Sequence, residues 1–321
     1  MTTMCSRLSI PSSPGSPDPA RMTEQPVAEQ PVAEQRSVTV SEAEAVRRYY
    51  RGKIAAIIDR YGPGPRVHYH IGLFDGCSPA PSSTAQQIRA RIVAAQERML
   101  ESAASVWDAG TLFTGNLLEV GCGLGGGAIY WAQHFPVQVT AVTNVAEQAA
   151  VTHIFAIAAG VAERVRALVG DIGELRLTRQ YAVAVAVESS CYVPRPQLFQ
   201  RVAAALEPGG VFGIEDIFLA QPAWRELFDG YWKTRIGTVA QYQRAAEQAG
   251  LILDKDLDVT AGTSDFWRHS VAWARARLAE PTLSTPEEER LMRSIFWHSQ
   301  FLDGWRDGAY QTRILRFRKP G

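Results

Sequence analysis

The chain has 321 residues, of which 46% are hydrophobic and 21% charged, an ordinary balance for one large globular domain or for a domain with a cap. Basic and acidic residues each number 33, and this zero net charge argues against a nucleic-acid substrate, because phosphate binding requires a basic excess. The four cysteines lack metal-ligand spacing, and there is neither a signal-peptide pattern nor a run of roughly 18 apolar residues. We therefore predict a soluble, cytoplasmic protein with no membrane span and no bound metal.

The first third of the chain divides into a tail and a helical region. Residues 1–38 are rich in Ser, Pro, Ala and Gln, so they bury too little apolar surface to offset the entropy of ordering, and we predict a disordered tail. A helix-start pattern at Ser41 leads into a helix that ends at Gly62-Pro-Gly-Pro65. A polar and aromatic loop then precedes a second helix over about Thr84 to Val106. We assign residues 39–110 to an N-terminal helical lid.

From residue 111 onward, short β-rich runs alternate with helical stretches. This order predicts an α/β fold with a Rossmann-like, doubly wound, mostly parallel sheet and helices on both faces. The predicted strands are Asn116–Val120, Val137–Val142, Val165–Val169, Tyr181–Val187, Val211–Ile214 and, at the end of the chain, Tyr310–Arg318. The predicted helices are Ala146–Ala159, Pro196–Leu206, Val239–Ala249, Phe266–Ala279 and one that starts at Thr285. We assign residues 111–321 to this domain, with a helical insertion at about 221–300.

The central motif is Leu117-Leu-Glu-Val-Gly-Cys-Gly-Leu-Gly-Gly-Gly127, a buried strand that runs into a turn built on Gly121 and Gly123. Glycine lets the backbone turn sharply and approach a ligand closely. Rossmann dehydrogenases share this glycine pattern, so the pattern alone does not identify the ligand. Glu119 favours a ligand that carries an amino group, because a carboxylate at this point repels the pyrophosphate of a dinucleotide. The motif therefore suits the methionine part of S-adenosylmethionine (SAM).

Later strand ends supply the other predicted cofactor contacts. Thr143 and Asn144 follow the second strand, where a ribose is expected, and their hydroxyl and amide groups can bond ribose hydroxyls. Many methyltransferases have an acid there, so this chain departs from the usual pattern. We assign Gln148, in the next helix, to the same site. Asp171 follows the third strand, where it can accept the adenine amine while Ile172 packs on the ring.

The candidate catalytic residues lie at the fourth strand and in the polar loop. Glu188 follows the fourth strand, and we predict that it contacts the cofactor and acts as the catalytic base; ordering a loop or a ligand is its alternative role. His68 and His70 lie on one side of the loop if the loop is extended. We predict a catalytic role for His68 and a cofactor contact for His70, since two histidines alone do not predict a metal. Tyr50 either closes over the cofactor or belongs to the helix core.

Together these motifs resemble the class I SAM-dependent methyltransferases over about Glu97 to Phe218. Within that class, Thr143 in place of an acid and the stretch Glu188-Ser-Ser-Cys-Tyr192 are similar to C-methyltransferases of prenyl and sterol substrates, including geranyl diphosphate C-methyltransferases. The resemblance implies methyl transfer to a carbon of an isoprenoid natural product, through a carbocation that is quenched by deprotonation or cyclisation. It also implies a homo-oligomer, and Mg²⁺ only if the substrate carries a diphosphate.

Two other functions stay open at this point. The first is N- or O-methylation of a small metabolite, because glycine- and sarcosine-type N-methyltransferases share part of the lid pattern. The second is a catalytically inactive methyltransferase fold that acts as a binding protein, which the intact glycine turn, Glu119 and Asp171 disfavour. Aromatic residues crowd the C-terminal third, and some of them can wall an apolar cavity. For a diphosphate substrate, the nearest cationic candidates are Arg60, Arg66 and Arg195.

Overall fold

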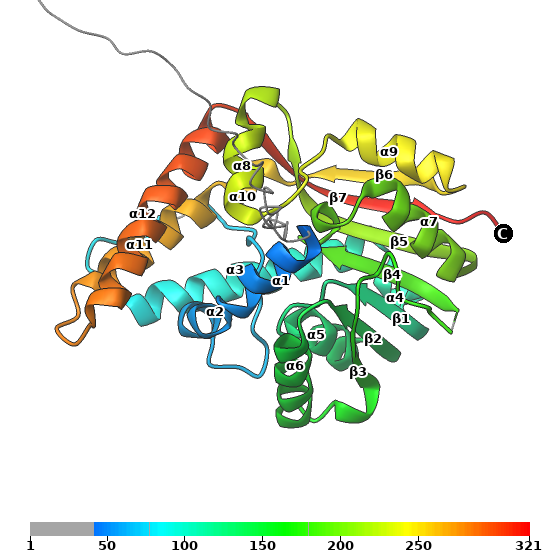
Figure 1. Ribbon diagram of the computed structural model, residues 1–321, viewed down its shortest axis with the longest axis horizontal. Helices are drawn as coiled ribbons and strands as arrows, with labels where there is room; N and C mark the ends of the chain where they lie inside the picture. Colours follow the sequence, from blue (N-terminus) through cyan, green and yellow to red (C-terminus); the bar gives the residue numbers. More distant parts are fainter. Residues whose placement is uncertain (1–41, 77, 179) are drawn as a thin grey trace, which may run out of the picture. The chain divides into compact units, whose positions relative to one another are not determined.

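A computed structural model describes residues 42–76, 78–178 and 180–321 of the chain (Figure 1). Residues 40–321 form one compact unit. The predicted tail, residues 1–38, and the helix-start residue Ser41 lie outside the described residues. The predicted boundary at residue 110, between a lid and a sheet domain, stays a prediction.

A seven-stranded sheet, in the order β3-β2-β1-β4-β5-β7-β6, forms the centre of the molecule (Figure 1). Its strands are β1 (Gly115–Val120), β2 (Val137–Thr143), β3 (Val165–Val169), β4 (Tyr181–Val187), β5 (Leu206–Leu219), β6 (Ile252–Asp258) and β7 (Tyr310–Arg318). Strands β1 to β5 are parallel to one another, whereas β7 runs antiparallel to β5 and β6. The predicted mostly parallel, Rossmann-like sheet is confirmed.

Two strands differ from the prediction. Strand β6 lies within the segment predicted as a helical insertion, and its alternating acids suit an exposed sheet edge but hide it from a hydrophobicity pattern. Strand β5 is longer than predicted, because Leu206 already pairs with Tyr181. Val211 pairs with Val183, so residues 207–210 loop out of register where the sequence predicts a turn.

The helices are α1 (Glu42–Arg51), α2 (Ile54–Tyr61), α3 (Ala85–Val106), α4 (Ala109–Leu112), α5 (Gly126–His134), α6 (Ala146–Ala158), α7 (Arg195–Ala205), α8 (Arg225–Trp232), α9 (Val239–Gln248), α10 (Thr260–Thr263), α11 (Asp265–Leu278) and α12 (Thr285–Arg306). The prediction of one continuous helix before Gly62 was wrong. Gly52 has low helix propensity, and the amide of Lys53 bonds the carbonyl of Tyr50 at 3.0 Å in a tighter turn, so the chain breaks between α1 and α2.

The two faces of the sheet bury separate apolar clusters, as the alternation of a strand requires. Leu117 packs in a cluster with α3, α5, α11 and α12, whereas Leu118 packs with α7 and α9 on the opposite face. The indole of Trp107, which follows α3, donates a hydrogen bond of 2.9 Å to the carbonyl of Leu315 in β7. The helices of the first cluster are therefore fixed to the sheet, with the carboxyl ends of β1, β2 and β4 facing α1.

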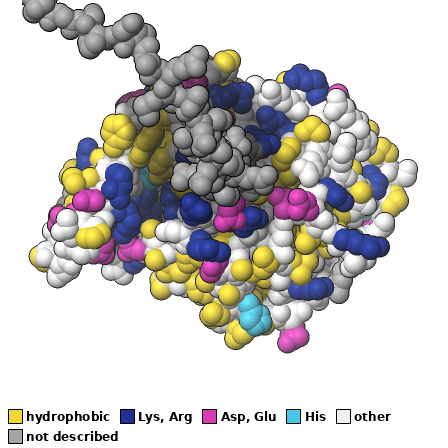
Figure 2. All heavy atoms as spheres, viewed as in Figure 1, with side chains coloured by type: hydrophobic (Ala, Val, Ile, Leu, Met, Phe, Trp, Pro, Cys, Tyr) yellow, Lys and Arg dark blue, Asp and Glu magenta, His cyan; other side chains and the backbone are white. Residues whose placement is uncertain are grey.

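The surface shows no large field of one charge sign on the face in Figure 2, where basic, acidic and apolar side chains are interspersed. Within the described ranges, every helix is too short or too polar to cross a lipid bilayer.

Candidate active site

The turn after β1 is built on left-handed glycines. Gly121, Gly123 and Gly125 have φ angles of 73°, 53° and 84°, which residues with a Cβ rarely adopt. The amide of Gly121 donates to the carbonyl of Val142 at 2.8 Å, so the turn is tied to β2. A Cβ on Gly121 would lie 2.4 Å from the Cβ of Ser189. Glycine is therefore required here for both conformation and space.

Glu119 presents a buried acid behind this turn. Its side chain is 3% exposed, and its Oε2 has no hydrogen-bond partner among the described residues. Burial raises the pKa of this carboxyl to about 8. A Cβ on Gly127 would lie 2.2 Å from Glu119 Oε1, so the absence of a side chain at 127 makes room for the carboxylate. An unpaired buried acid of this kind fits a cationic amino group of a ligand.

A cavity of about 580 Å³ opens over the glycine turn, and we call it the glycine-loop cavity. The residues that line it include all of the predicted site residues, namely Tyr50, His68, His70, Glu119, Gly121, Gly123, Thr143, Asn144, Gln148, Asp171, Ile172 and Glu188. The fold thus brings residues from α1, the polar loop and four strand ends to one place. Their individual roles stay predictions.

Short hydrogen bonds organise the polar groups at the strand ends. The hydroxyl of Thr143 donates to Gln148 Oε1 at 2.7 Å and accepts the amide of Val145 at 3.2 Å. Asp171 Oδ1 accepts the amide of Gly173 at 2.8 Å. Because the single hydroxyl proton of Thr143 is already used, this residue can only accept a hydrogen bond from a ribose hydroxyl.

The polar loop is held by partners in α3. His68 Nε2 lies 2.7 Å from Glu97 Oε1, and Gln96 Nε2 donates to the carbonyl of His70 at 2.6 Å. His70 Nδ1 lies 2.7 Å from the carbonyl of Ile71, and burial lowers the pKa of His70 to about 3, so its ring is neutral and donates from Nδ1. The two rings lie with centroids 5.3 Å apart. Sequence reasoning did not identify Glu97 or Gln96, because nothing in the chain pattern links α3 to this loop.

A second cavity, of about 510 Å³, lies beside the first, and we call it the aromatic cavity. Its aromatic walls come mainly from α1, α2, α8, α11 and α12 and comprise Tyr49, Tyr50, Tyr61, Tyr69, Tyr192, Phe228, Tyr231, Trp232, Phe266, Trp267 and Trp297. Arg60 lines this cavity, whereas Arg66 pairs with Glu97 and Arg195 bonds the carbonyl of Arg235. Lys53 also lines it, 4.1 Å from the ring centroid of Tyr49.

The two cavities share a wall that includes Tyr50, Tyr69, His70, Glu188 and Tyr192. The hydroxyls of Tyr50 and Tyr192 form a short hydrogen bond, and burial raises the pKa of both groups. Glu188 follows β4 with a left-handed φ of 42°, a strained conformation that turns the residue out of the strand. Its Oε1 accepts the amide of Ile71 at 2.5 Å. Burial and the nearby Asp216 raise the pKa of Glu188 well above its usual range.

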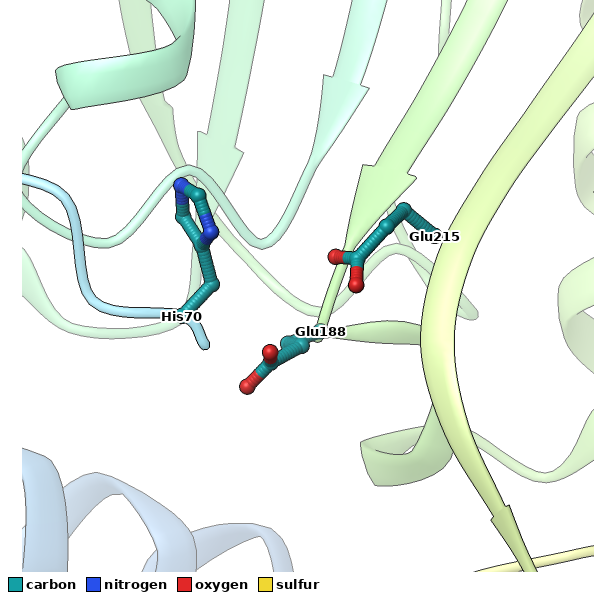
Figure 3. A group of neighbouring side chains, drawn as sticks. All are labelled: His70, Glu188 and Glu215. Atoms are coloured by element: carbon teal, nitrogen blue, oxygen red, sulfur yellow. The ribbon is translucent and has the colours of Figure 1, made fainter. Parts of the chain in front are cut away.

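One group of described side chains comes close to the geometry of a metal site. The ligand-type atoms of His70, Glu188 and Glu215 lie within 4.8 Å of one another (Figure 3). His70 and Glu188 already bond the backbone of Ile71, through its carbonyl and its amide. The set therefore fits a metal ion poorly, because both side chains would have to give up these contacts.

Comparisons with known proteins agree with this site. A family described as a methyltransferase domain matches residues 117–210. Geranyl diphosphate 2-C-methyltransferases of Streptomyces lasalocidi and Streptomyces ambofaciens are 26% and 25% identical, over 85% and 84% of this chain and 88% and 90% of theirs. The structure of geranyl diphosphate C-methyltransferase from Streptomyces coelicolor A3(2), with Mg²⁺, geranyl diphosphate and S-adenosyl-L-homocysteine, superposes with a TM-score of 0.69 at 19% identity, over 87% of this chain and 97% of that one.

The matched domain and the glycine turn at the end of β1 define the chain as a class I SAM-dependent methyltransferase. Among enzymes of that class, it resembles the geranyl diphosphate C-methyltransferases. The predicted class and the narrower resemblance are both confirmed.

Proposed function

We propose that this protein transfers the methyl group of SAM to a carbon of an isoprenoid small molecule. The observation that carries the proposal is the wall shared by the two cavities. One cavity has the glycine turn and the unpaired Glu119, which suit a charged donor, and the other has aromatic walls, which suit an apolar acceptor. Glu188 lines both, so it lies where a donor and an acceptor meet.

The residues of the glycine-loop cavity fit the cofactor. Glu119 would accept the ammonium group of the methionine part, which compensates the cost of its burial. Thr143 and Asn144 would face the ribose, while Asp171 and Ile172 would hold the adenine. When bound, SAM supplies an electrophilic methyl group on a sulfonium.

The aromatic cavity and Glu188 would handle the positive charge that forms on the acceptor. A double bond that takes up a methyl cation becomes a carbocation, and each aromatic face stabilises such a charge by about 0.5–2 kcal/mol. Glu188 would remove a proton from the carbon next to the cation. The electrons of that C–H bond then restore the double bond, and the proton resides on the carboxylate.

The relatives' names support an isoprenoid acceptor, and one of their structures contains Mg²⁺ and geranyl diphosphate. A diphosphate acceptor would place anionic oxygens near Lys53 and Arg60, which line the aromatic cavity. Burial lowers the pKa of Lys53 to about 7, and an anion beside it would raise that pKa again. Mg²⁺ would accompany the diphosphate only in that case. A prenylated, uncharged natural product is the other form of the proposed substrate.

The test combines binding and product analysis. SAM and S-adenosylhomocysteine should bind in calorimetry, and Gly127→Ala should weaken both because its Cβ displaces the Glu119 carboxylate. Gly110→Ala, another helical glycine with open space around its Cβ, is the matched control. Mass spectrometry with prenyl diphosphates, prenylated indoles and amines should show C-methylated isoprenoid products. Methylated amines or alcohols alone would overturn the C-methylation proposal, and absence of SAM binding would indicate an inactive fold.

The oligomeric state stays a prediction. We propose a homo-oligomer, as the resemblance implies, and sedimentation of the purified chain would decide it.

A further inference from the structure

Two carboxyl groups lie side by side at neighbouring strand ends in Figure 3, Glu188 after β4 and Glu215 in β5. Their backbones are fixed to each other, because the amide of Glu188 donates to the carbonyl of Glu215 at 2.8 Å. Glu215 is completely buried and lines neither cavity. The mechanism above uses Glu188 and leaves Glu215 without a role.

The two groups differ in how a negative charge would be stabilised. Glu188 Oε1 accepts the amide of Ile71, whereas neither oxygen of Glu215 has a hydrogen-bond partner among the described residues. A buried carboxylate without donors is costly, and two buried charges at this distance raise each other's cost. Only one member of the pair can therefore carry a charge at moderate cost, and Glu188 is the better placed.

No cation compensates the pair among the groups that interact with it in the described part of the chain. The ring of His70 is neutral, and Asp216 adds a further acid, which accepts the amides of Ser190 and Ile217. The groups that interact electrostatically with Glu188 from α1, α2 and the turn after β4 are neutral ones, namely Tyr50, Tyr61 and Cys191. Protonation of one carboxyl is thus the remaining way to reduce the charge.

We propose that Glu215 holds the single proton of a two-carboxyl pair and thereby leaves Glu188 as the ionised member that faces both cavities. Glu215 is then a positioning residue, since it touches neither ligand and acts through Glu188. The assignment of Glu188 as the base rests on the proposed function, but the location of the proton does not. After turnover, the proton from the acceptor carbon makes the pair doubly protonated, and its release to water restores the starting state.

Infrared difference spectroscopy of the ligand-free protein at neutral pH tests the location of the proton. A background with Glu119→Gln removes the other buried acid, whose pKa of about 8 would give an overlapping signal. The carboxylic-acid C=O band should disappear in Glu215→Gln and remain in Glu188→Gln. A band that disappears in Glu188→Gln and remains in Glu215→Gln would overturn the proposal, as would the absence of any such band.

Kinetics then test the role of the proton. Gln is a neutral isostere of protonated Glu, so Glu215→Gln should keep nearly the wild-type kcat at neutral pH and lose the inflection at high pH where Glu215 ionises. Glu215→Leu, also neutral, should behave in the same way and serves if the Gln variant folds poorly. A tenfold or greater loss of kcat with unchanged KM in both variants would show that an ionised Glu215 is needed. Complete lack of methyl transfer in the wild type would defeat the proposed function and leave the infrared result valid.

Discussion

The two cavities are built in different ways. Backbone turns and strand ends form most of the glycine-loop cavity, so its shape follows from glycine positions and from short hydrogen bonds. Aromatic side chains of five helices that are far apart in the chain form the aromatic cavity. The first can be recognised from local motifs, whereas the second exists only after α1, α2, α8, α11 and α12 have packed together. Changes at the shared wall should therefore affect catalysis, and changes on either side should affect one ligand each.

The largest effect is expected at the shared wall. Glu188→Gln keeps the size of the side chain but removes the proton acceptor, so kcat should fall by about 10²–10⁴-fold. Calorimetry with SAM should show little change, because Glu119 and the glycine turn are intact. Unchanged turnover would remove Glu188 from the mechanism and reduce it to a residue that orders the polar loop.

Glu119→Gln should stabilise the ligand-free protein. The folded-state pKa of Glu119, about 8, lies above its ordinary value of 4.5, so the stability that this group allows is fully present below pH 4.5 and is lost as the pH rises through 8. The Gln variant does not titrate, and its advantage in unfolding free energy should grow over this window to roughly 2–5 kcal/mol. Urea unfolding of both proteins between pH 5 and 8.5 measures the difference. A pH-independent difference would contradict the raised pKa.

The same substitution should weaken cofactor binding. A hydrogen bond to a charged group is worth about 1.5–3 kcal/mol, so Glu119→Gln should raise the Kd of SAM about 10–150-fold. The KM for the acceptor should stay the same, since Glu119 does not line the aromatic cavity. An equal change in both parameters would mean that the two cavities are not separate binding sites.

A wall residue of the aromatic cavity should have a smaller effect. Trp232→Leu removes one aromatic face, so kcat/KM for the acceptor should fall by about 2–30-fold, with SAM affinity unchanged. Phe296→Leu is the matched control, because Phe296 is 58% exposed and lines neither cavity. Equal losses in the two variants would indicate a general packing defect in place of cation stabilisation.

The smallest effect is expected at the ion pair between Arg51 of α1 and Glu147 of α6, which joins the helical region to the glycine-loop side at 2.7 Å. Both side chains are exposed, and such pairs contribute little because water and salt screen them. Arg51→Gln should leave the Kd of SAM within about twofold of the wild-type value. A larger, salt-dependent change in calorimetry would show that closure of α1 depends on this contact.

Local sequence patterns determined the sheet and the glycine-loop cavity. The boundaries of β3, β4 and β7 agree with the predicted strands, and every predicted site residue lines that cavity. The physical reason is that parallel strands place their carboxyl ends at one edge, and glycine turns leave a signature in the chain itself. Thus the order of strands, glycines and strand-end polar residues was enough to bring these residues together.

Only the tertiary structure decided the surroundings of Glu188. The break between α1 and α2, the antiparallel strand β6 and the contact of Glu188 with Ile71 all depend on packing between distant segments. The same holds for Glu215, an acid that reads as an ordinary strand-end residue until burial leaves it without a donor. Burial and long-range contacts set its charge state, and neither can be read from neighbouring residues in the chain.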